Sequence, residues 1–149
     1  MRKILVLSII CLFASACGGP VEEPTKPVAQ KQKSIEYMLA TIEKGYVSNG
    51  DIIIARFRSL LEQLESKFVE NKKQISDMSV KGQQLLKEEG VKESLLNIME
   101  GMNGLFSKES ANLKYAKYMS YYMGLRTSGQ SHHEAIEGLK AILQDLGIY

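Results

Sequence analysis

The sequence predicts an all-α protein, a small bundle of about five to six helices. All three prolines lie before residue 34. Behind them, apolar residues recur at the three- and four-residue intervals of amphipathic helices. Short segments rich in Asn, Gly and Ser separate these runs and can start or end helices. Residues 34–149 suffice for one hydrophobic core and are too few for two, so we expect a single helical domain there.

The first two expected helices are separated by a turn at residues 48–50. Asp51 is expected to cap the second helix. The polar side of that second helix is expected to be solvated. The apolar positions are Ile35, Met38, Leu39, Ile42 and Tyr46, then Ile53, Phe57, Leu60, Leu61, Leu64 and Phe68; the polar side comprises Arg56, Gln63, Lys67 and Glu70.

A third and a fourth helix are expected between residues 76 and 104. Ser76 and Asp77 offer the cap of the third helix, which ends at Gly90. The fourth closes around residues 103–104. The apolar positions are Met78, Val80, Leu85 and Leu86 in the third, and Leu95, Leu96, Ile98, Met99 and Met102 in the fourth.

The fifth expected helix runs from Ser107 to about Arg126 and has apolar residues on two sides, which predicts a central helix with neighbours on both. Ser131 and Glu134 form a capping box for the sixth helix, which ends at Gly147. The two sides of the fifth are Tyr115, Tyr118, Met119, Tyr122 and Leu125, and Leu113, Ala116, Ser120 and Met123; the sixth is expected to turn Ile136, Leu139, Ile142, Leu143 and Leu146 to the core.

Residues 121–125 and 133–136 faintly resemble one tetratricopeptide unit. The interval between them is one residue short of that family's pattern, and the sequence shows no second copy. Because a solenoid needs several repeats to bury its core, we keep this only as an alternative to the single bundle.

The N-terminus has the pattern of an export signal. Basic residues at 2 and 3 precede an apolar run over 4–13, which is too short to span a bilayer. Small residues then lead to Cys17. This resembles a bacterial lipoprotein signal, with Ala14 where the family usually has Leu. The resemblance implies a signal peptide over 1–16 and a lipidated Cys17 that carries palmitate-type acyl chains; the alternative is an ordinary secretory signal with an incidental cysteine.

The resemblance also implies a location and a redox state. Gly18 behind the cysteine favours the outer membrane over the inner one, with the domain facing the periplasm. Cys11 would leave with the signal, and lipid would occupy the sulfur of Cys17, so no disulfide is expected. Residues 17–33 hold the prolines and several charges but no aromatic residue. We expect them to form a disordered tether, with the helical domain at 34–149.

Charge and motifs exclude several classes of function. Arg2 and Lys3 are the only charged residues before Cys17 and account for the formal net charge of +2, so the mature part is balanced. It has no strongly basic field for nucleic acid. The sequence shows no nucleophile paired with a base and no glycine-rich phosphate loop. We therefore predict a protein that is not an enzyme and needs no cofactor.

Four tyrosines between residues 115 and 122 are the densest unusual feature. Aromatic rings with polar tips are favoured at interfaces, so Tyr115, Tyr118 and Tyr122 are candidates for binding a peptide or helix. The alternative is an aromatic core whose hydroxyls reach the surface. The sequence leaves both open.

Metal sites are weaker candidates. His132 and His133 are adjacent, so their side chains diverge on a helix, and we expect both to be exposed. Met99 with Met102, and Met119 with Met123, have converging spacing and soft sulfur atoms that suit Cu(I). Methionine is more commonly core filler.

These observations lead to two hypotheses. The first is a membrane-anchored, non-enzymatic lipoprotein whose helical domain binds an envelope protein. Its architecture and location are similar to those of pilotins and surface-exclusion factors, an analogy that rests on architecture and location only. The second is a carrier of a soft metal or small ligand that uses the Met- and Tyr-rich helix.

Overall fold

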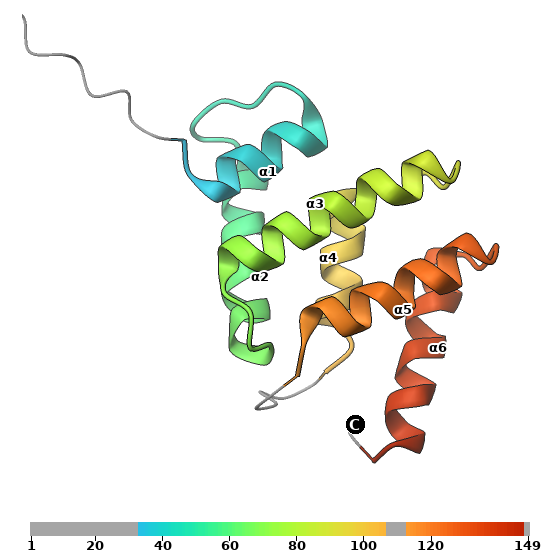
Figure 1. Cartoon of the computed structure of the whole chain (residues 1–149). Coiled ribbons are helices and arrows are strands. Elements are labelled where there is room, and N and C mark those ends of the chain that lie inside the picture. The colour runs from blue at the N-terminus through green and yellow to red at the C-terminus, as the bar shows by residue number, and fades with distance from the viewer. Residues whose placement is uncertain (1–32, 107–112, 148–149) are drawn as a thin grey trace, which may run out of the picture. The chain divides into compact units, whose positions relative to one another are not determined.

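A computed structural model describes residues 33–106 and 113–147 and confirms the all-α fold class. In this part of the chain no helix has both the length and the apolar character needed to cross a bilayer. Figure 1 shows the helices in chain order: α1 (Ile35–Lys44), α2 (Ile52–Lys67), α3 (Lys72–Glu88), α4 (Leu95–Asn103), α5 (Tyr115–Thr127) and α6 (His132–Asp145).

Two of the helix starts are as the sequence predicts. The carboxylate of Asp51 accepts a hydrogen bond from the N–H of Ile53 at the start of α2. Ser131 and Glu134 form the reciprocal capping box of α6. Each cap satisfies backbone donors that have no partner within their own helix.

Two boundaries were wrong. α1 ends at Lys44, before the predicted turn at 48–50, and Gly45 follows as its C-cap with a φ of 83°. α3 begins after Asn71, which forms a capping box with Gln74, and not at Ser76 and Asp77. Ser76 is instead a buried residue inside the helix. The sequence prediction overlooked asparagine as a cap and therefore shortened this helix.

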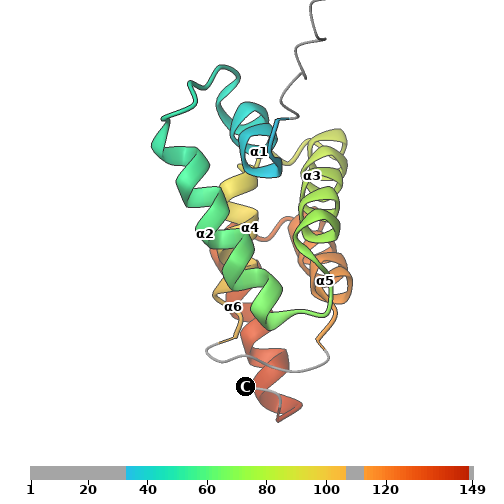
Figure 2. The same ribbon diagram turned by 90° about the vertical axis from the view of Figure 1, so that its left-hand side faces the viewer.

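The central helix is α4, and not the fifth helix as predicted. α4 packs against each of the other five helices, whereas α5 packs against α3, α4 and α6. Figure 2 shows α4 between α2 and the pair formed by α3 and α5. Four side chains of this short helix are completely buried: Leu95, Ile98, Met99 and Met102.

The predicted second apolar side of α5 is also wrong. Ala116 and Ser120 are exposed, and Met123 is half-buried. Leu113 lies before the helix, which begins at Tyr115; the predicted start at Ser107 lies outside the described residues. α5 thus has one buried face, formed by Tyr115, Tyr118, Met119 and Tyr122 together with Arg126.

The apolar stripe of α2 is confirmed, because all six of its predicted residues are buried. In α1 and α6 only some of the apolar residues that were predicted to face the core are buried. Leu39 is buried, but Met38 and Ile42 are each 48% exposed and Tyr46 is 87% exposed. Ile142 of α6 and the C-cap residue Leu146 are exposed, while Ile136, Leu139 and Leu143 are buried. Leu85 of α3 is likewise partly exposed.

The polar side of α2 is not simply solvated. Arg56 forms an ion pair with Glu100, and the Nζ of Lys67 donates to the carbonyl of Asn103 at 2.7 Å. A cation there is favourable because the carbonyl end of α4 carries partial negative charge. Partial burial lowers the pKa of Lys67. Glu70, just beyond α2, accepts from the N–H groups of Tyr115 and Ala116.

The signal peptide over 1–16, Cys17 and nearly all of the tether over 17–33 lie outside the described residues. The expectations on export, lipidation and the tether therefore stay predictions.

Candidate functional site

An open groove lies between α1, α3 and the loop that joins α3 to α4. We call it the α1–α3 groove. It consists of two adjoining hollows of about 890 and 470 Å³ that share Ile42, Val80 and Gln84. The larger hollow is lined by Ile42, Val80, Gln83, Gln84, Lys87, Gly90, Val91, Lys92, Glu93, Ser94 and Asn97, and the smaller by Met38, Leu39, Ile42, Ser76, Asp77, Val80, Lys81 and Gln84.

The groove has an apolar strip along α1 that the described helices cover only in part. Met38 and Ile42 are four residues apart, so they lie on one side of α1. Each is 48% exposed, although each belongs to the apolar series that was expected to face the core. Val80 continues the strip on α3 and packs partly against the core. These side chains give the groove the apolar lining that is typical of binding clefts.

The charges on the groove are asymmetric. Its two lining carboxylates are already paired: Asp77 with Lys73 at 2.6 Å, and Glu93 with Arg126 at 2.9 Å. The lysines at 81, 87 and 92 also line the groove and are exposed. Within residues 33–106 and 113–147 they form no ion pair. The lining of the groove therefore places an apolar strip beside three lysines that have no ion-pair partner among the described residues.

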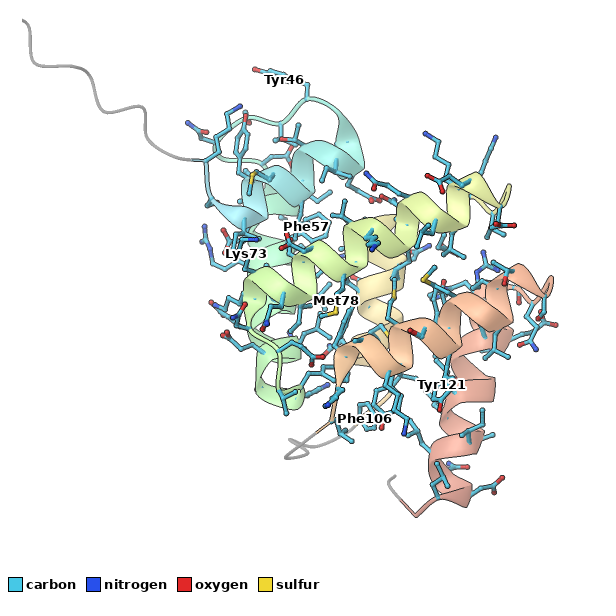
Figure 3. All side chains as sticks on the ribbon, in the orientation of Figure 1. Tyr46, Phe57, Lys73, Met78, Phe106 and Tyr121 are labelled. Atoms are coloured by element: carbon cyan, nitrogen blue, oxygen red, sulfur yellow. The ribbon has the colours of Figure 1, made fainter. Side chains whose placement is uncertain are left out.

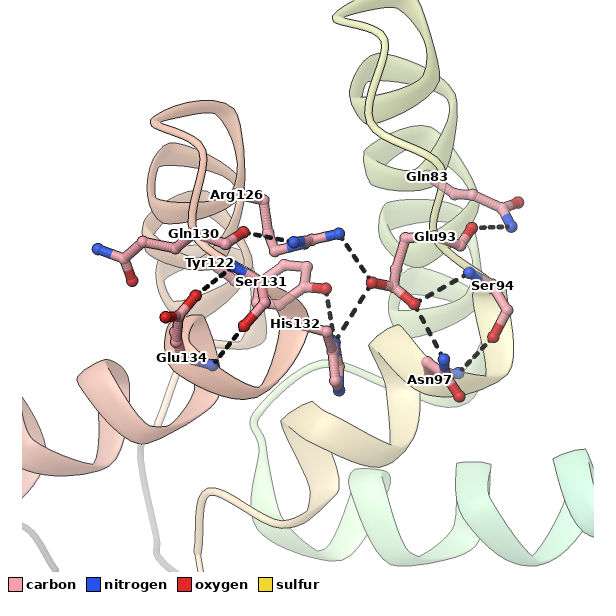
Figure 4. A network of polar contacts seen from close by, with 10 residues as sticks. All are labelled: Gln83, Glu93, Ser94, Asn97, Tyr122, Arg126, Gln130, Ser131, His132 and Glu134. Carbon is pink, nitrogen blue, oxygen red and sulfur yellow. Dashed lines mark hydrogen bonds and ion pairs between the residues drawn. The ribbon is translucent and has the colours of Figure 1, made fainter.

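A polar network with a buried ion pair at its centre fixes one end of the groove (Figure 4). Its centre is Glu93, in the loop between α3 and α4. Oε2 of Glu93 pairs with Nη2 of Arg126 at 2.9 Å, and Oε1 accepts from the side-chain amide of Asn97 at 3.0 Å. The backbone carbonyl of Glu93 accepts from Gln83 at 3.0 Å. Arg126 also donates to the carbonyl of Gln130. These bonds connect the loop to α3, α4 and α5.

His132 belongs to this network and is not exposed as predicted. Its Nδ1 lies 2.7 Å from the hydroxyl of Tyr122 and 3.7 Å from Oε2 of Glu93. Desolvation lowers the pKa of His132 and outweighs the opposing effect of Glu93. Burial likewise raises the pKa of Tyr122, with the charge of Glu93 adding to the shift. His133, by contrast, is exposed as expected.

The three candidate tyrosines lie in the core and do not line the α1–α3 groove. Tyr115 and Tyr122 are fully buried, and Tyr118 is nearly so. The hydroxyl of Tyr115 lies 2.6 Å from Oγ of Ser79, which donates to the carbonyl of Ile75. Burial raises the pKa of Tyr115. Of the two possibilities left open by the sequence, this geometry agrees with the aromatic core.

Edge-to-face contacts hold that core together. The ring of Phe68 packs on Phe106 and Tyr115 with centroids 5.6 and 5.1 Å apart, and Phe106 packs on Tyr118 at 5.2 Å. Figure 3 labels Phe106, which is drawn below α5, and Tyr121, which is a residue of α5 itself. Tyr121 is the one tyrosine of the cluster that is substantially exposed. The rings favour this arrangement because their edges and faces carry opposite partial charges.

The methionine pairs serve the packing of the core. Met99, Met102 and Met119 are buried, and Met119 rests against Gly82 on α3. The described residues contain no group of three or more His, Cys, Asp and Glu side chains that is placed to hold a metal ion.

The sequence did not reveal the groove residues, because periodicity shows which side of a helix is apolar but not whether another helix packs on that side. Met38 and Ile42 have the spacing of core residues, and only the packing of α1 on α2, α3 and α4 shows that they remain partly exposed. The segment from Lys81 to Glu93 holds three lysines and three glutamates, so its composition gave no signal of a basic groove.

The comparisons with known proteins gave one match. The model of a family described as MoxZ matches residues 29–144, which include all of the helices except the last residue of α6. Searches of curated proteins and of solved structures returned no significant match. The matched region comprises most of the chain, and the protein belongs to the MoxZ family.

Proposed function

We propose that this protein is a lipid-anchored, non-enzymatic envelope protein whose helical domain binds a segment of a partner protein in the α1–α3 groove. The observation that carries the proposal is the exposure of Met38 and Ile42 on the wall of an open hollow. Exposed apolar side chains gathered in a concave surface mark sites of binding, because covering them removes apolar surface from water.

The polar network supports a recognition role, because a preformed site loses less conformational entropy on binding. Glu93 holds the loop at the end of the groove through bonds to Arg126 and Asn97. The anchor at Cys17 remains part of the proposal. A tether over 17–33 would let the domain reach partners near the membrane, as an assembly accessory or an exclusion factor does.

Photo-crosslinking in intact cells tests the groove. A photoreactive amino acid is placed at Met38 or Gln84, on the two walls, and at Ile52 or Ile142, which are exposed outside the groove. We expect one protein adduct of the same mass from both groove positions and none from the two controls. Ile42→Asp should remove that adduct while leaving the circular dichroism of the protein unchanged. Equal adducts from all four positions, or none from the groove, would contradict the proposal.

The anchor is tested separately. Intact mass should show lipid on Cys17, and Cys17→Ser should release the protein from the membrane fraction. An unmodified thiol at Cys17 would contradict lipid anchoring. It would not affect the groove assignment, which the crosslinking experiment tests independently.

A further inference from the structure

We infer that the segment bound in the α1–α3 groove is acidic and amphipathic, with apolar side chains that meet α1 and carboxylates that meet the lysines of α3 and its following loop. This inference rests on the proposed function and adds the chemistry of the partner to it.

Charge complementarity is the first argument. Lys81, Lys87 and Lys92 line the groove, and none forms an ion pair within the described residues. The carboxylates that share the lining, Asp77 and Glu93, are already neutralised by Lys73 and Arg126. Opposite charge on a partner would raise the rate of association and reject basic segments.

The length of the charged series is the second argument. Lys81 and Lys87 are six residues apart in α3, which corresponds to about 9 Å along a helix. Lys92 follows in the loop beyond the helix. Positive charge therefore extends along the groove and is not concentrated at one point. A row of charges of this kind fits an extended series of carboxylates better than a single small anion.

The apolar strip is the third argument. Met38 and Ile42 have the i, i+4 spacing with which one helix face contacts another. An amphipathic segment placed in a groove uses anchors of the same spacing. A free inorganic anion would match the lysines but leave these two side chains in contact with water. A peptide that has both features satisfies the whole lining.

The test uses the full-length protein in cells with the photoreactive residue at Met38. The variant Lys81→Glu/Lys92→Glu places one reversed charge in each hollow. The matched control, Arg58→Glu/Lys117→Glu, makes the same change of net charge at exposed residues outside the groove lining. We expect the groove variant to lower the adduct yield about tenfold, because charges at an interface govern encounter. The control should retain the yield of the unmodified chain.

Mass spectrometry of the adduct supplies a second readout. The crosslinked partner peptide should have an excess of Asp and Glu over Lys and Arg, with apolar residues at helical spacing. A neutral or basic peptide, an adduct of lipid mass, or an adduct with a second copy of this chain would overturn the inference. So would an undiminished yield from Lys81→Glu/Lys92→Glu. With a neutral or basic partner peptide, or with an undiminished yield, a groove-specific protein adduct that Ile42→Asp removes would still support the proposed function. An adduct of lipid mass, or loss of all groove adducts in the unmodified chain, would contradict both.

Discussion

Glu93 and Arg126, thirty-three positions apart in the sequence, form an ion pair of 2.9 Å in which their side chains are only 7% and 9% exposed. The pair joins the loop after α3 to the C-terminal turn of α5. Isolated charges are costly to bury, and each of these residues makes further hydrogen bonds that offset the cost. The ion pair therefore determines where the loop at the end of the α1–α3 groove lies.

Removing one partner of this pair should destabilise the protein strongly. Glu93→Ala leaves the guanidinium of Arg126 buried without its carboxylate, and we expect a loss of about 3–5 kcal/mol in the free energy of unfolding. The paired replacement Glu93→Leu/Arg126→Met removes both charges and should cost much less. Urea unfolding measures both. Equal losses for the single and the paired variants would show that the charge itself is not the cause.

The stability of the domain should fall as the pH drops below about 6.5, because His132 binds a proton less readily in the folded state than in the unfolded chain. Desolvation lowers the pKa of His132 below its ordinary value of 6.5. The unfolded chain therefore binds the proton more readily than the folded one. The stabilisation is fully present above pH 6.5 and is lost as the pH falls towards the pKa of the folded state. Glu93, Arg126, Tyr122, Glu100 and His133 surround this group.

Thermal unfolding at several pH values checks this expectation. His132→Gln should flatten the dependence of the melting temperature on pH in this range. His133→Gln changes an exposed neighbour and should retain the slope of the unmodified protein. An unchanged slope in His132→Gln would assign the effect to another group.

Glu70 should stabilise α5 from outside that helix. Its carboxylate accepts from the N–H of Tyr115 at 2.8 Å and of Ala116 at 3.3 Å, while the N-cap residue Lys114 makes no side-chain cap. Glu70→Ala should lower the free energy of unfolding by about 1–2 kcal/mol. The control Glu62→Ala removes an exposed ion pair with Lys72, and should cost at most about 1 kcal/mol. Urea unfolding compares the two, and a cost for Glu70→Ala no larger than that of the control would contradict the cap.

Gly101 and Gly124 should respond in opposite ways to replacement by alanine. A Cβ at Gly101 would lie 2.6 Å from Cδ1 of Ile136 and 2.8 Å from Cε1 of His132, where α4 meets α6. Gly101→Ala should therefore cost about 1–3 kcal/mol. At Gly124 nothing lies within 4 Å of such an atom. Gly124→Ala should gain up to about 1 kcal/mol from helix propensity. Denaturation curves that show a gain for both would mean that α4 and α6 do not approach closely at Gly101.

The elements of the fold could largely be predicted from the sequence, because local chemistry determines them. The stripe of α2 from Ile53 to Phe68, the cap at Asp51 and the capping box of Ser131 with Glu134 depend on residues within a few positions of each other. The errors at Gly45 and Asn71 were also local: each residue can end or begin a helix, and flanking residues offered a competing signal.

The groove could not be predicted, because it depends on which apolar faces other helices cover. Met38 and Leu39 are adjacent in an apolar series, yet one is half exposed and the other buried. In the same way, nothing near Glu93, Tyr122 and His132 in the sequence indicates that they meet.

The amino-acid sequence by itself determined the all-α class, most helix positions and the balanced charge of the region behind Cys17, because periodicity, caps and composition are properties of short segments. Only the tertiary structure decided that α4 is central, that the tyrosines are core residues, and that the lysines at 81, 87 and 92 lie beside a partly exposed apolar strip. The physical reason is that burial and ion pairing arise from contacts between segments, and these contacts exist only once the helices have packed.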